Sequence, residues 1–276
     1  MSKINYSVDD IKKYIVERKT WGSYFVVDNF IEESFFKELC KDYNYLKTKD
    51  KNIWTEVEKP RVWRFTEPKG MNLIIGGAGS EENYFNKLCS LSKIWKEFIE
   101  VIHSDESHKY FIDIFSDTKS FKDSISNQDL KDSVIRCKLS SQLNNYGFII
   151  HPDGEQKLIS YLLYLDNDDW DEDSEGGTDL WEVLDSDVEY SDDESSIDYQ
   201  MRDGRLWTVK KPSVRLTENE SKRVSKFKSI RFKANRLVGF VRNNKSYHSV
   251  PPRILPESVT RDCFQINIWN LRSREK

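Results

Sequence analysis

The chain has 276 residues, of which 37% are hydrophobic, 33% charged and 13% aromatic, and its formal net charge is −4. So many aromatic residues exclude a disordered chain, and so small a net charge does not favour nucleic acid or an anionic membrane as a partner. No apolar run is long enough to span a bilayer and the N-terminus has no apolar signal core, so we expect a soluble intracellular protein.

The first hundred residues favour helices with one inserted strand. Ser7, which two aspartates follow closely, predicts the start of a short helix through Lys19. Tyr24–Val27 is β-branched and aromatic and predicts a strand. Apolar residues at helical spacing predict further helices over Glu32–Leu46 and about Glu81–Ile102. The apolar stripe of the last helix comprises Phe85, Leu88, Leu91, Trp95, Phe98 and Ile102.

After His103 the sequence changes to short β-rich segments that turn residues separate. We predict strands at Tyr110–Phe115, Val134–Leu139, Gly147–His151, Leu158–Leu165, Asp179–Leu184, Ser229–Phe232, Arg236–Val241 and Cys263–Trp269. Several short strands behind leading helices predict a mainly β fold, a sandwich or jelly roll with helical support.

A charged segment interrupts this pattern. Asp185–Asp198 is acidic and almost free of core residues, and a basic stretch follows it up to Arg231. A solvated insertion explains this composition, and so does a lid or substrate-docking loop beside an active site.

The cysteines do not indicate a disulfide framework or a zinc site. The chain has 4, they lie far apart, and none belongs to a CxxC pair. We therefore expect buried, reduced thiols.

The histidines carry the clearest chemical pattern. There are 4, and two of them, His103 and His151, have an aspartate at the second following position, Asp105 and Asp153. On a strand these two positions face the same side, so the imidazole and the carboxylate can point at one ion. With a distant histidine they would form a two-histidine, one-carboxylate set, which leaves coordination positions open on Fe(II).

Sequence context separates the two copies. His103 ends an amphipathic helix and His108 lies in the same polar run, so we expect both on the surface. His151 ends the apolar segment YGFII and precedes the predicted strand LISYLLYL, which places it on a sheet.

The order of motifs downstream of His151 resembles the prolyl 4-hydroxylase-like branch of the 2-oxoglutarate/Fe(II) dioxygenase superfamily. The matching motifs are His151/Asp153, Tyr164-Leu165-Asp166, Trp170-Asp171, Gly176-Gly177, Leu237–Phe240, His248-Ser249-Val250 and Arg261. The resemblance covers about 144–269 well and 24–46 loosely, and the order and spacing of the motifs are more specific than any one of them.

The resemblance implies one domain over 1–276 with a double-stranded β-helix core, a jelly roll related to cupins. The expected parts are a helix-rich region over 1–108, the core at about 109–272 and a charged insertion at about 185–228. N-terminal helices would pack on the core.

The resemblance also implies a ligand set. His151, Asp153 and His248 would hold Fe(II), and Arg261 would bind the far carboxylate of 2-oxoglutarate, because a guanidinium pairs with a carboxylate through two hydrogen bonds. Tyr164 would either donate a hydrogen bond to that carboxylate or serve as a core aromatic. Arg253 is a rival to Arg261, but it lies in the loop-like segment PPRILP.

The implied reaction couples oxidative decarboxylation of 2-oxoglutarate to succinate with hydroxylation of a C–H bond. Partners would be 2-oxoglutarate, O₂ and a protein or small-molecule substrate, with a prolyl or other peptidyl side chain favoured and ascorbate as a supporting reductant. Alternatives are a cupin-like binding module that oxidises nothing and an interaction module with a vestigial metal site. A nucleic-acid demethylase of the same superfamily is disfavoured, because such relatives carry a second arginine where this chain has Asn267.

Overall fold

A computed structural model describes residues 3–49, 55–56, 70–75, 88–125, 130–142, 148–154, 156–165, 176–183, 196–200, 206–210, 224–251 and 259–270. No helix in these segments has the length and apolar character that a membrane crossing requires.

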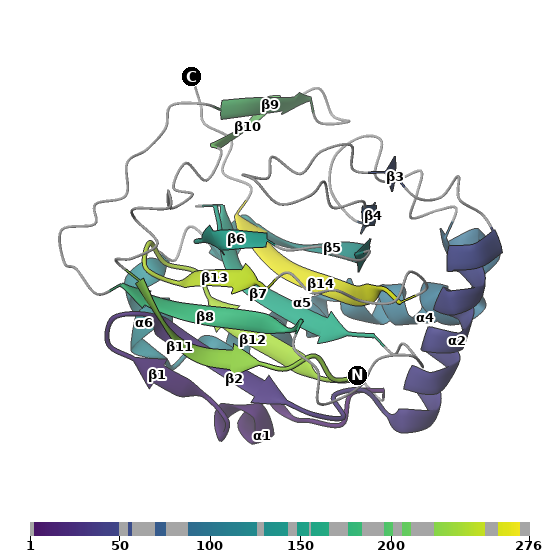
Figure 1. The fold of residues 1–276 in the computed structure, drawn as a ribbon, viewed down its shortest axis with the longest axis horizontal. Coiled ribbons are helices and arrows are strands. Elements are labelled where there is room, and N and C mark those ends of the chain that lie inside the picture. Colours follow the sequence, from purple (N-terminus) through teal and green to yellow (C-terminus); the bar gives the residue numbers. More distant parts are fainter. Residues whose placement is uncertain are drawn as a thin grey trace.

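The larger of two facing sheets forms the centre of the molecule (Figure 1). In the described segments it has eight strands, and every neighbouring pair is antiparallel. Their order across the sheet is β1 (Val16–Arg18), β2 (Gly22–Val27), β12 (Leu237–Val241), β7 (Lys157–Tyr164), β14 (Arg261–Asn270), β5 (Ser133–Gln142), β4 (Gly70–Ile75) and β3 (Thr55–Glu56).

The smaller sheet has four strands among the described residues. Their order is β11 (Val224–Ile230), β8 (Thr178–Val183), β13 (Tyr247–Val250) and β6 (Phe148–His151). From β5 to β8, and again from β11 to β14, each successive strand lies in the other sheet. This alternation is the topology of a jelly roll, so the predicted mainly β fold with a double-stranded β-helix core is confirmed.

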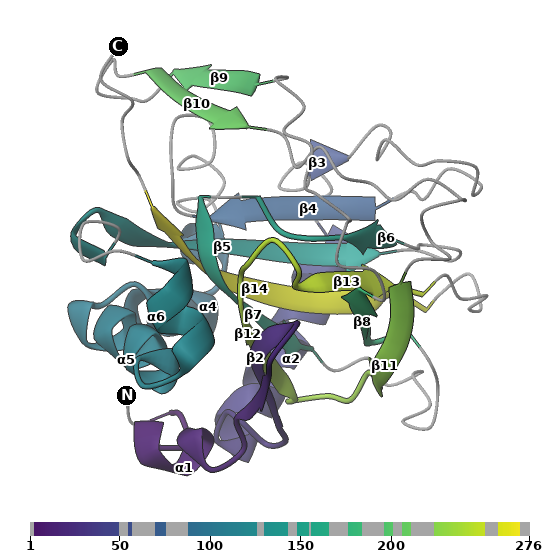
Figure 2. The same ribbon diagram turned by 90° about the vertical axis from the view of Figure 1, so that its left-hand side faces the viewer.

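Five helices with assigned bounds support the larger sheet. They are α1 (Val8–Lys12), α2 (Glu33–Lys49), α4 (Lys93–Ile102), α5 (Asp105–Phe115) and α6 (Lys119–Ser124). Figure 2 shows α4, α5 and α6 on one side of the larger sheet, away from β8, β11 and β13. The helices therefore leave the face between the two sheets free for a site.

The face of the larger sheet under the helices forms the main hydrophobic core. Phe264 on β14 lies 5.7 Å from the Trp95 ring and 5.2 Å from the Phe98 ring, both on α4. On β7, the Tyr161 ring lies 4.9 Å from Phe111 of α5. Burial of aromatic rings is the main stabilising contribution here, because each removes a large apolar area from water.

Between the sheets lies a smaller second cluster. It consists of Trp21, Tyr24, Tyr164, Leu180, Ile230, Phe232, Val238, Phe240 and Cys263. This cluster fills part of the space between the two sheets.

The predicted strand at Tyr110–Phe115 is wrong, because these residues belong to α5. The Ser104 side chain caps the helix by accepting from the Ser107 amide, and Asp105 and Glu106 occupy its first turn. Tyr110, Phe111, Ile114 and Phe115 are buried at helical spacing. The apolar composition of the segment favoured a strand, but the cap and the burial pattern are those of a helix.

The first predicted helix is too long. It ends at Lys12, and Val16–Arg18 instead forms β1, which pairs with β2. Pairing at the edge of the larger sheet satisfies backbone groups that a marginal helix would leave to water.

The predicted helix over 81–102 is interrupted within its described part. Ser92 is the N-cap of α4, and its side chain accepts from the Trp95 amide. Leu91, placed in the apolar stripe, is 46% exposed, because the break turns it away from the core. Residues 81–87 lie outside the described part of the chain.

The charged insertion was predicted too long at its C-terminal end. Val224–Lys228 belongs to β11, which pairs with β8 in the smaller sheet, so β11 also begins earlier than the predicted Ser229. Within the insertion, β9 (Ser196–Gln200) pairs with β10 (Leu206–Lys210). The remaining residues of the insertion lie outside the described residues.

The N-terminal region contributes strands as well as helices. β1 and β2 extend the larger sheet beside β12, and β3 and β4 extend it beside β5. Three of the four cysteines, Cys40, Cys137 and Cys263, are buried free thiols as expected, and Cys89 is partly buried.

Candidate metal centre

The two histidines that the sequence singles out lie side by side in the smaller sheet. His151 ends β6, and its register partner on β13 is His248. Their ring centroids are 4.4 Å apart. The ligand atoms of His151, Asp153 and His248 all lie within 4.8 Å of one another. Ligands of one ion at about 2.1 Å can be at most about 4.2 Å apart, so small side-chain rotations suffice to bring the three atoms around one ion.

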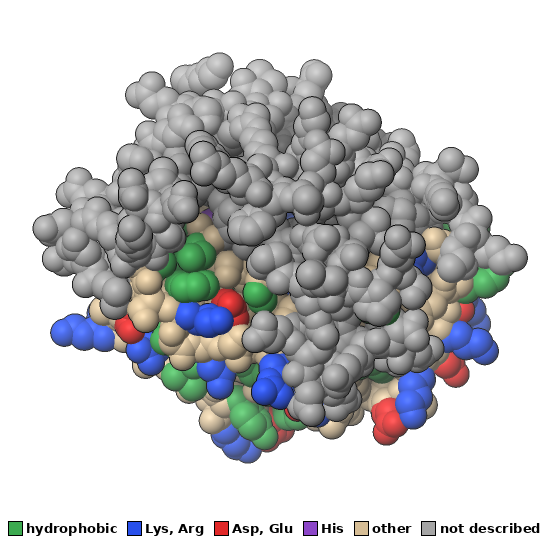
Figure 3. All heavy atoms as spheres, viewed as in Figure 1, with side chains coloured by type: hydrophobic (Ala, Val, Ile, Leu, Met, Phe, Trp, Pro, Cys, Tyr) green, Lys and Arg blue, Asp and Glu red, His purple; other side chains and the backbone are tan. Residues whose placement is uncertain are grey.

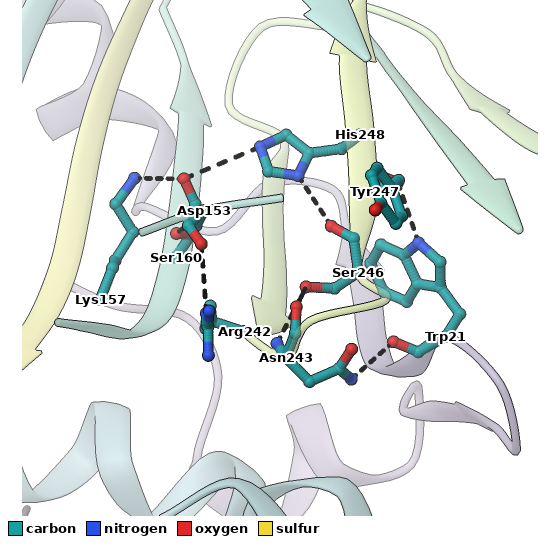
Figure 4. Close-up of polar contacts among 9 residues, drawn as sticks. All are labelled: Trp21, Asp153, Lys157, Ser160, Arg242, Asn243, Ser246, Tyr247 and His248. Atoms are coloured by element: carbon teal, nitrogen blue, oxygen red, sulfur yellow. Dashed lines mark hydrogen bonds and ion pairs between the residues drawn. The ribbon is translucent and has the colours of Figure 1, made fainter. Parts of the chain in front are cut away.

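Two neighbouring side chains hold the Asp153 carboxylate (Figure 4). The Lys157 ammonium donates to Oδ1 at 2.7 Å, and the Ser160 hydroxyl donates to Oδ2 at 2.6 Å. The Arg242 Nε donates to the Asp153 main-chain oxygen at 3.1 Å. Each carboxylate oxygen has two lone pairs, so these bonds fix the orientation of the group and leave electron pairs for an ion.

The electrostatics keep Asp153 anionic. Burial by itself raises the pKa of the carboxyl, but the Lys157 ammonium, His248 and His151 outweigh burial and hold the pKa of Asp153 below its usual range. The residue is therefore charged at neutral pH, the form in which it can bind a metal.

The surroundings of His248 favour its neutral form. Its Nδ1 lies 3.1 Å from the Ser246 carbonyl oxygen, so an Nδ1–H donates there and the Nε2 lone pair remains free to bind. Nε2 faces Asp153 Oδ1 at 3.9 Å. Burial lowers the pKa of His248, and the Phe240 ring packs 4.8 Å from the imidazole. The neutral imidazole is the form that ligates a metal.

A turn between β12 and β13 fixes the carbonyl that orients His248 (Figure 4). The Asn243 amide donates to Ser246 Oγ at 2.9 Å, and Asn243 Nδ2 donates to the Trp21 carbonyl at 2.8 Å. The Trp21 indole in turn donates to the Tyr247 carbonyl at 2.9 Å. The turn is thus tied to the N-terminal strand region, far away in sequence.

Arg261 is buried at the start of β14. Its Nε donates to the Gly176 carbonyl at 2.6 Å, Nη2 donates to the Gly177 carbonyl at 3.2 Å, and Nη1 donates to Gln142 Oε1 at 2.7 Å. Its guanidinium carbon lies 5.2 Å from the centre of the Tyr164 ring. A guanidinium has five N–H groups, and beyond these three bonds Arg261 also has a side-chain interaction with the Tyr164 hydroxyl.

The Gly-Gly pair matters for backbone reasons. Gly176 has a φ of +112°, a backbone conformation that residues other than glycine rarely adopt. A Cβ at Gly177 would lie 1.7 Å from the main-chain oxygen of Ile230 on β11. These two glycines let the backbone pass close to β11, and their carbonyl oxygens accept hydrogen bonds from Arg261.

One cavity joins Arg261 to the histidine–aspartate cluster. Its volume is about 310 Å³, and His151, Asp153, His248 and Arg261 all line it. Tyr164 is not among its lining residues, and the Tyr164 hydroxyl instead pairs with Thr178 Oγ1 at 2.7 Å. A larger hollow of about 960 Å³ lies beside Arg18 and Lys119 but contains none of the four, so it is not the candidate site.

The other predicted candidates lie elsewhere. His103 is exposed as predicted. His108 is half-buried rather than exposed, with Nε2 3.1 Å from Ser133 Oγ, because α5 packs against the start of β5. Arg253 lies outside the described residues.

The sequence patterns did not indicate the residues that support the ligands. Lys157 and Ser160 both follow Asp153 closely and start the next strand, a proximity that could have suggested them. Lys138 and Gln142, which also line the cavity, gave no comparable signal, because they come from β5 and the sequence does not reveal which face of β5 is enclosed.

The comparisons with known proteins concern the fold. No family model and no curated protein sequence matches the chain. Among solved structures, SnoN, a non-heme α-ketoglutarate-dependent epimerase from nogalamycin biosynthesis, has a TM-score of 0.50 at 8% identity, with 95% of this chain and 80% of SnoN covered. The chain therefore shares its fold with this enzyme.

Two further solved structures are similar at lower scores. A prolyl-4-hydroxylase from Pseudomonas putida has a TM-score of 0.45 at 11% identity, with 95% of this chain and 96% of that chain covered. HygX from Streptomyces hygroscopicus, whose structure holds nickel, 2-oxoglutarate and hygromycin B, has a TM-score of 0.43 at 10% identity, with 89% and 82% covered. At these identities the likeness concerns the fold, and function has to be argued from the site.

Proposed function

We propose that this protein is an Fe(II)- and 2-oxoglutarate-dependent oxygenase. The observation that carries the proposal is the single cavity that His151, Asp153 and His248 share with the buried Arg261. A metal-ligand set at one point of a small cavity and a guanidinium at another match the two ends of a 2-oxo dicarboxylic acid.

The donor set fits Fe(II). Two imidazoles and one carboxylate suit this ion and leave positions for other ligands, and no cysteine lies among the three. When bound, Fe(II) and 2-oxoglutarate supply the O₂ chemistry that converts a substrate C–H bond to C–OH while 2-oxoglutarate becomes succinate and CO₂.

The residues of the chain contribute position and charge. Lys157 and Ser160 hold the carboxylate of Asp153 at a fixed angle, and Ser246 fixes the imidazole of His248. The Arg261 guanidinium would take the far carboxylate of 2-oxoglutarate, and the Tyr164 ring beneath the guanidinium limits its movement. Since Tyr164 does not line the cavity, we propose for it this packing role rather than direct contact with the cosubstrate.

For the substrate we propose a C–H bond of a peptidyl side chain, such as that of proline. The support is the motif order that resembles prolyl 4-hydroxylases. The described basic side chains lie among acidic and hydrophobic ones on the face seen in Figure 3. The formal net charge of −4 does not favour a nucleic-acid substrate.

The decisive experiment needs no primary substrate. Purified protein with Fe(II), ascorbate and 2-oxoglutarate should form succinate slowly and consume O₂, whereas Asp153→Asn should form none and the exposed-site control Lys228→Ala should match wild type. Succinate formation by Asp153→Asn at the wild-type rate would remove the cluster from the reaction. Absence of turnover in wild type, together with tight metal binding, would favour a binding module.

A further inference from the structure

The floor of the cavity carries a lysine that the proposed function does not use. Lys138 on β5 lines the cavity together with Gln265 on β14 and Leu162 on β7. The register places these three side by side, because Lys138 pairs with Gln265 and Gln265 pairs with Leu162. Side chains of directly paired residues share one face of a sheet, so Lys138 belongs to the enclosed face.

The position of Lys138 lies between the two ends of the cavity. At one end, Arg261 pairs in register with Gln142. Toward the other, Asn267 pairs with Ser160, whose hydroxyl holds Asp153. Gln265, the partner of Lys138, lies between Arg261 and Asn267 on the same strand.

Lys138 has no hydrogen-bond or ion-pair partner within the described part of the chain. Two other largely buried lysines differ in this respect: Lys157 is paired with Asp153 at 2.7 Å, and Lys47 is paired with Asp262 at 2.9 Å. A cation in an enclosed space without a partner is costly, because it loses part of its hydration and receives nothing in exchange.

The cavity as a whole has an excess of positive charge. Among the described residues that line it, Lys138, Lys157 and Arg261 are basic, and Asp153 is the one acid. Burial, followed by the Lys157 ammonium, lowers the pKa of Lys138 to about 8, so the amine is still mostly protonated at neutral pH. Such a cavity attracts an anion of more than one negative charge.

We propose that the Lys138 ammonium binds a carboxylate of 2-oxoglutarate and acts beside Arg261 as a second cationic contact for the cosubstrate. The proposal rests on the proposed function. It adds a residue outside the recognised motifs and makes the cavity selective for a dianionic ligand. A carboxylate on the primary substrate is the other possible source of the anion.

Calorimetric titration of the Mn(II)-loaded protein tests this without turnover. The two probes are 2-oxoglutarate and 2-oxopentanoate, which keeps the oxo acid but lacks the far carboxylate. The variants are Lys138→Gln, Lys138→Arg and, as a matched loss of charge on the surface before β5, Lys131→Gln. Thermal unfolding without ligand checks each variant, and Lys138→Gln should melt no lower than wild type, because it removes a buried unpaired charge.

We expect Lys138→Gln to weaken 2-oxoglutarate binding by roughly 10- to 100-fold, the usual effect of losing a charge-assisted hydrogen bond. Lys138→Arg and Lys131→Gln should stay within about 3-fold of wild type. Weaker binding of 2-oxoglutarate alone would assign Lys138 to the far carboxylate, and equal weakening of both probes would assign it to the carboxylate beside the metal; either result supports the proposal.

Two results would overturn it in distinguishable ways. Wild-type affinity for 2-oxoglutarate in folded Lys138→Gln would sink the role of Lys138 alone, and would leave the primary substrate as the source of an anion. Failure of wild-type protein to bind 2-oxoglutarate while it binds Mn(II) would overturn the proposed function as well.

Discussion

Neighbouring residues on β14 face two different environments. Phe264, Ile266 and Ile268 are fully buried in the main hydrophobic core under the helices. On the other face, Arg261, Gln265 and Trp269 line the cavity between the sheets. One strand therefore carries a face that stabilises the fold and a face that is kept polar at a cost in stability, which is the expected division where a binding site is built on a rigid sheet.

The largest difference between the two faces should appear in the free energy of unfolding when one residue on each face is replaced by alanine. Phe264→Ala should lower the free energy of unfolding by about 3–5 kcal/mol, because it leaves a cavity beside Trp95 and Phe98. Gln265→Ala, one residue further along β14, should cost less than about 1 kcal/mol. Urea denaturation measures both values, and equal losses would contradict the division of labour between the faces.

Substitution of a metal ligand should instead weaken metal binding strongly and leave the free energy of unfolding almost unchanged. His151→Ala should weaken Fe(II) or Mn(II) binding by more than about 100-fold, since changes to mere supporting residues at metal sites already cost 10- to 100-fold. Its free energy of unfolding should change by less than about 1 kcal/mol, because His151 is only partly buried. Metal binding by equilibrium dialysis, paired with denaturation, would reveal a structural role if stability fell and metal affinity did not.

Substitution of Arg261 should affect both ligand binding and stability, each to a smaller extent. Arg261→Gln should raise the apparent KM for 2-oxoglutarate by roughly 10- to 100-fold and cost about 1–3 kcal/mol of stability, because the Gly176 and Gly177 carbonyls lose their donor. Arg253→Gln is the matched control and should change neither quantity. A larger KM effect at Arg253 would transfer the role to that residue.

A further comparison concerns the pH dependence of stability. In the folded protein the pKa of Lys138 is lowered to about 8 by burial and by Lys157, with Cys263 opposing, whereas an unfolded lysine titrates near about 10.4. Between these values the unfolded chain binds more protons, so the stability of wild type should rise with pH by roughly 1 kcal/mol per unit. Lys138→Met should lack this rise, and parallel curves for both proteins would place the lysine in water.

The sequence by itself was enough to nominate the ligands. His151 and Asp153 are two residues apart at the end of an apolar segment, a local pattern that survives in the structure, and the motif order added His248 and Arg261. The strands that carry His151 and Arg261 also followed from local composition, since β-branched and aromatic residues separated by turns need no tertiary information. The strand β13, which carries His248, was not predicted.

Only the tertiary structure decided which faces are enclosed. Arg136, Lys138 and Ser140 alternate with Ile135, Cys137 and Leu139 on β5, a pattern that local rules assign to water on the polar side. Because the smaller sheet covers that side, Lys138 lines the cavity instead. Packing likewise decided that Tyr110–Phe115 is helical, since an apolar run fits a helix or a strand. It also decided that Lys157 and Ser160 support Asp153, since a hydrogen bond depends on where the folded chain places its partners.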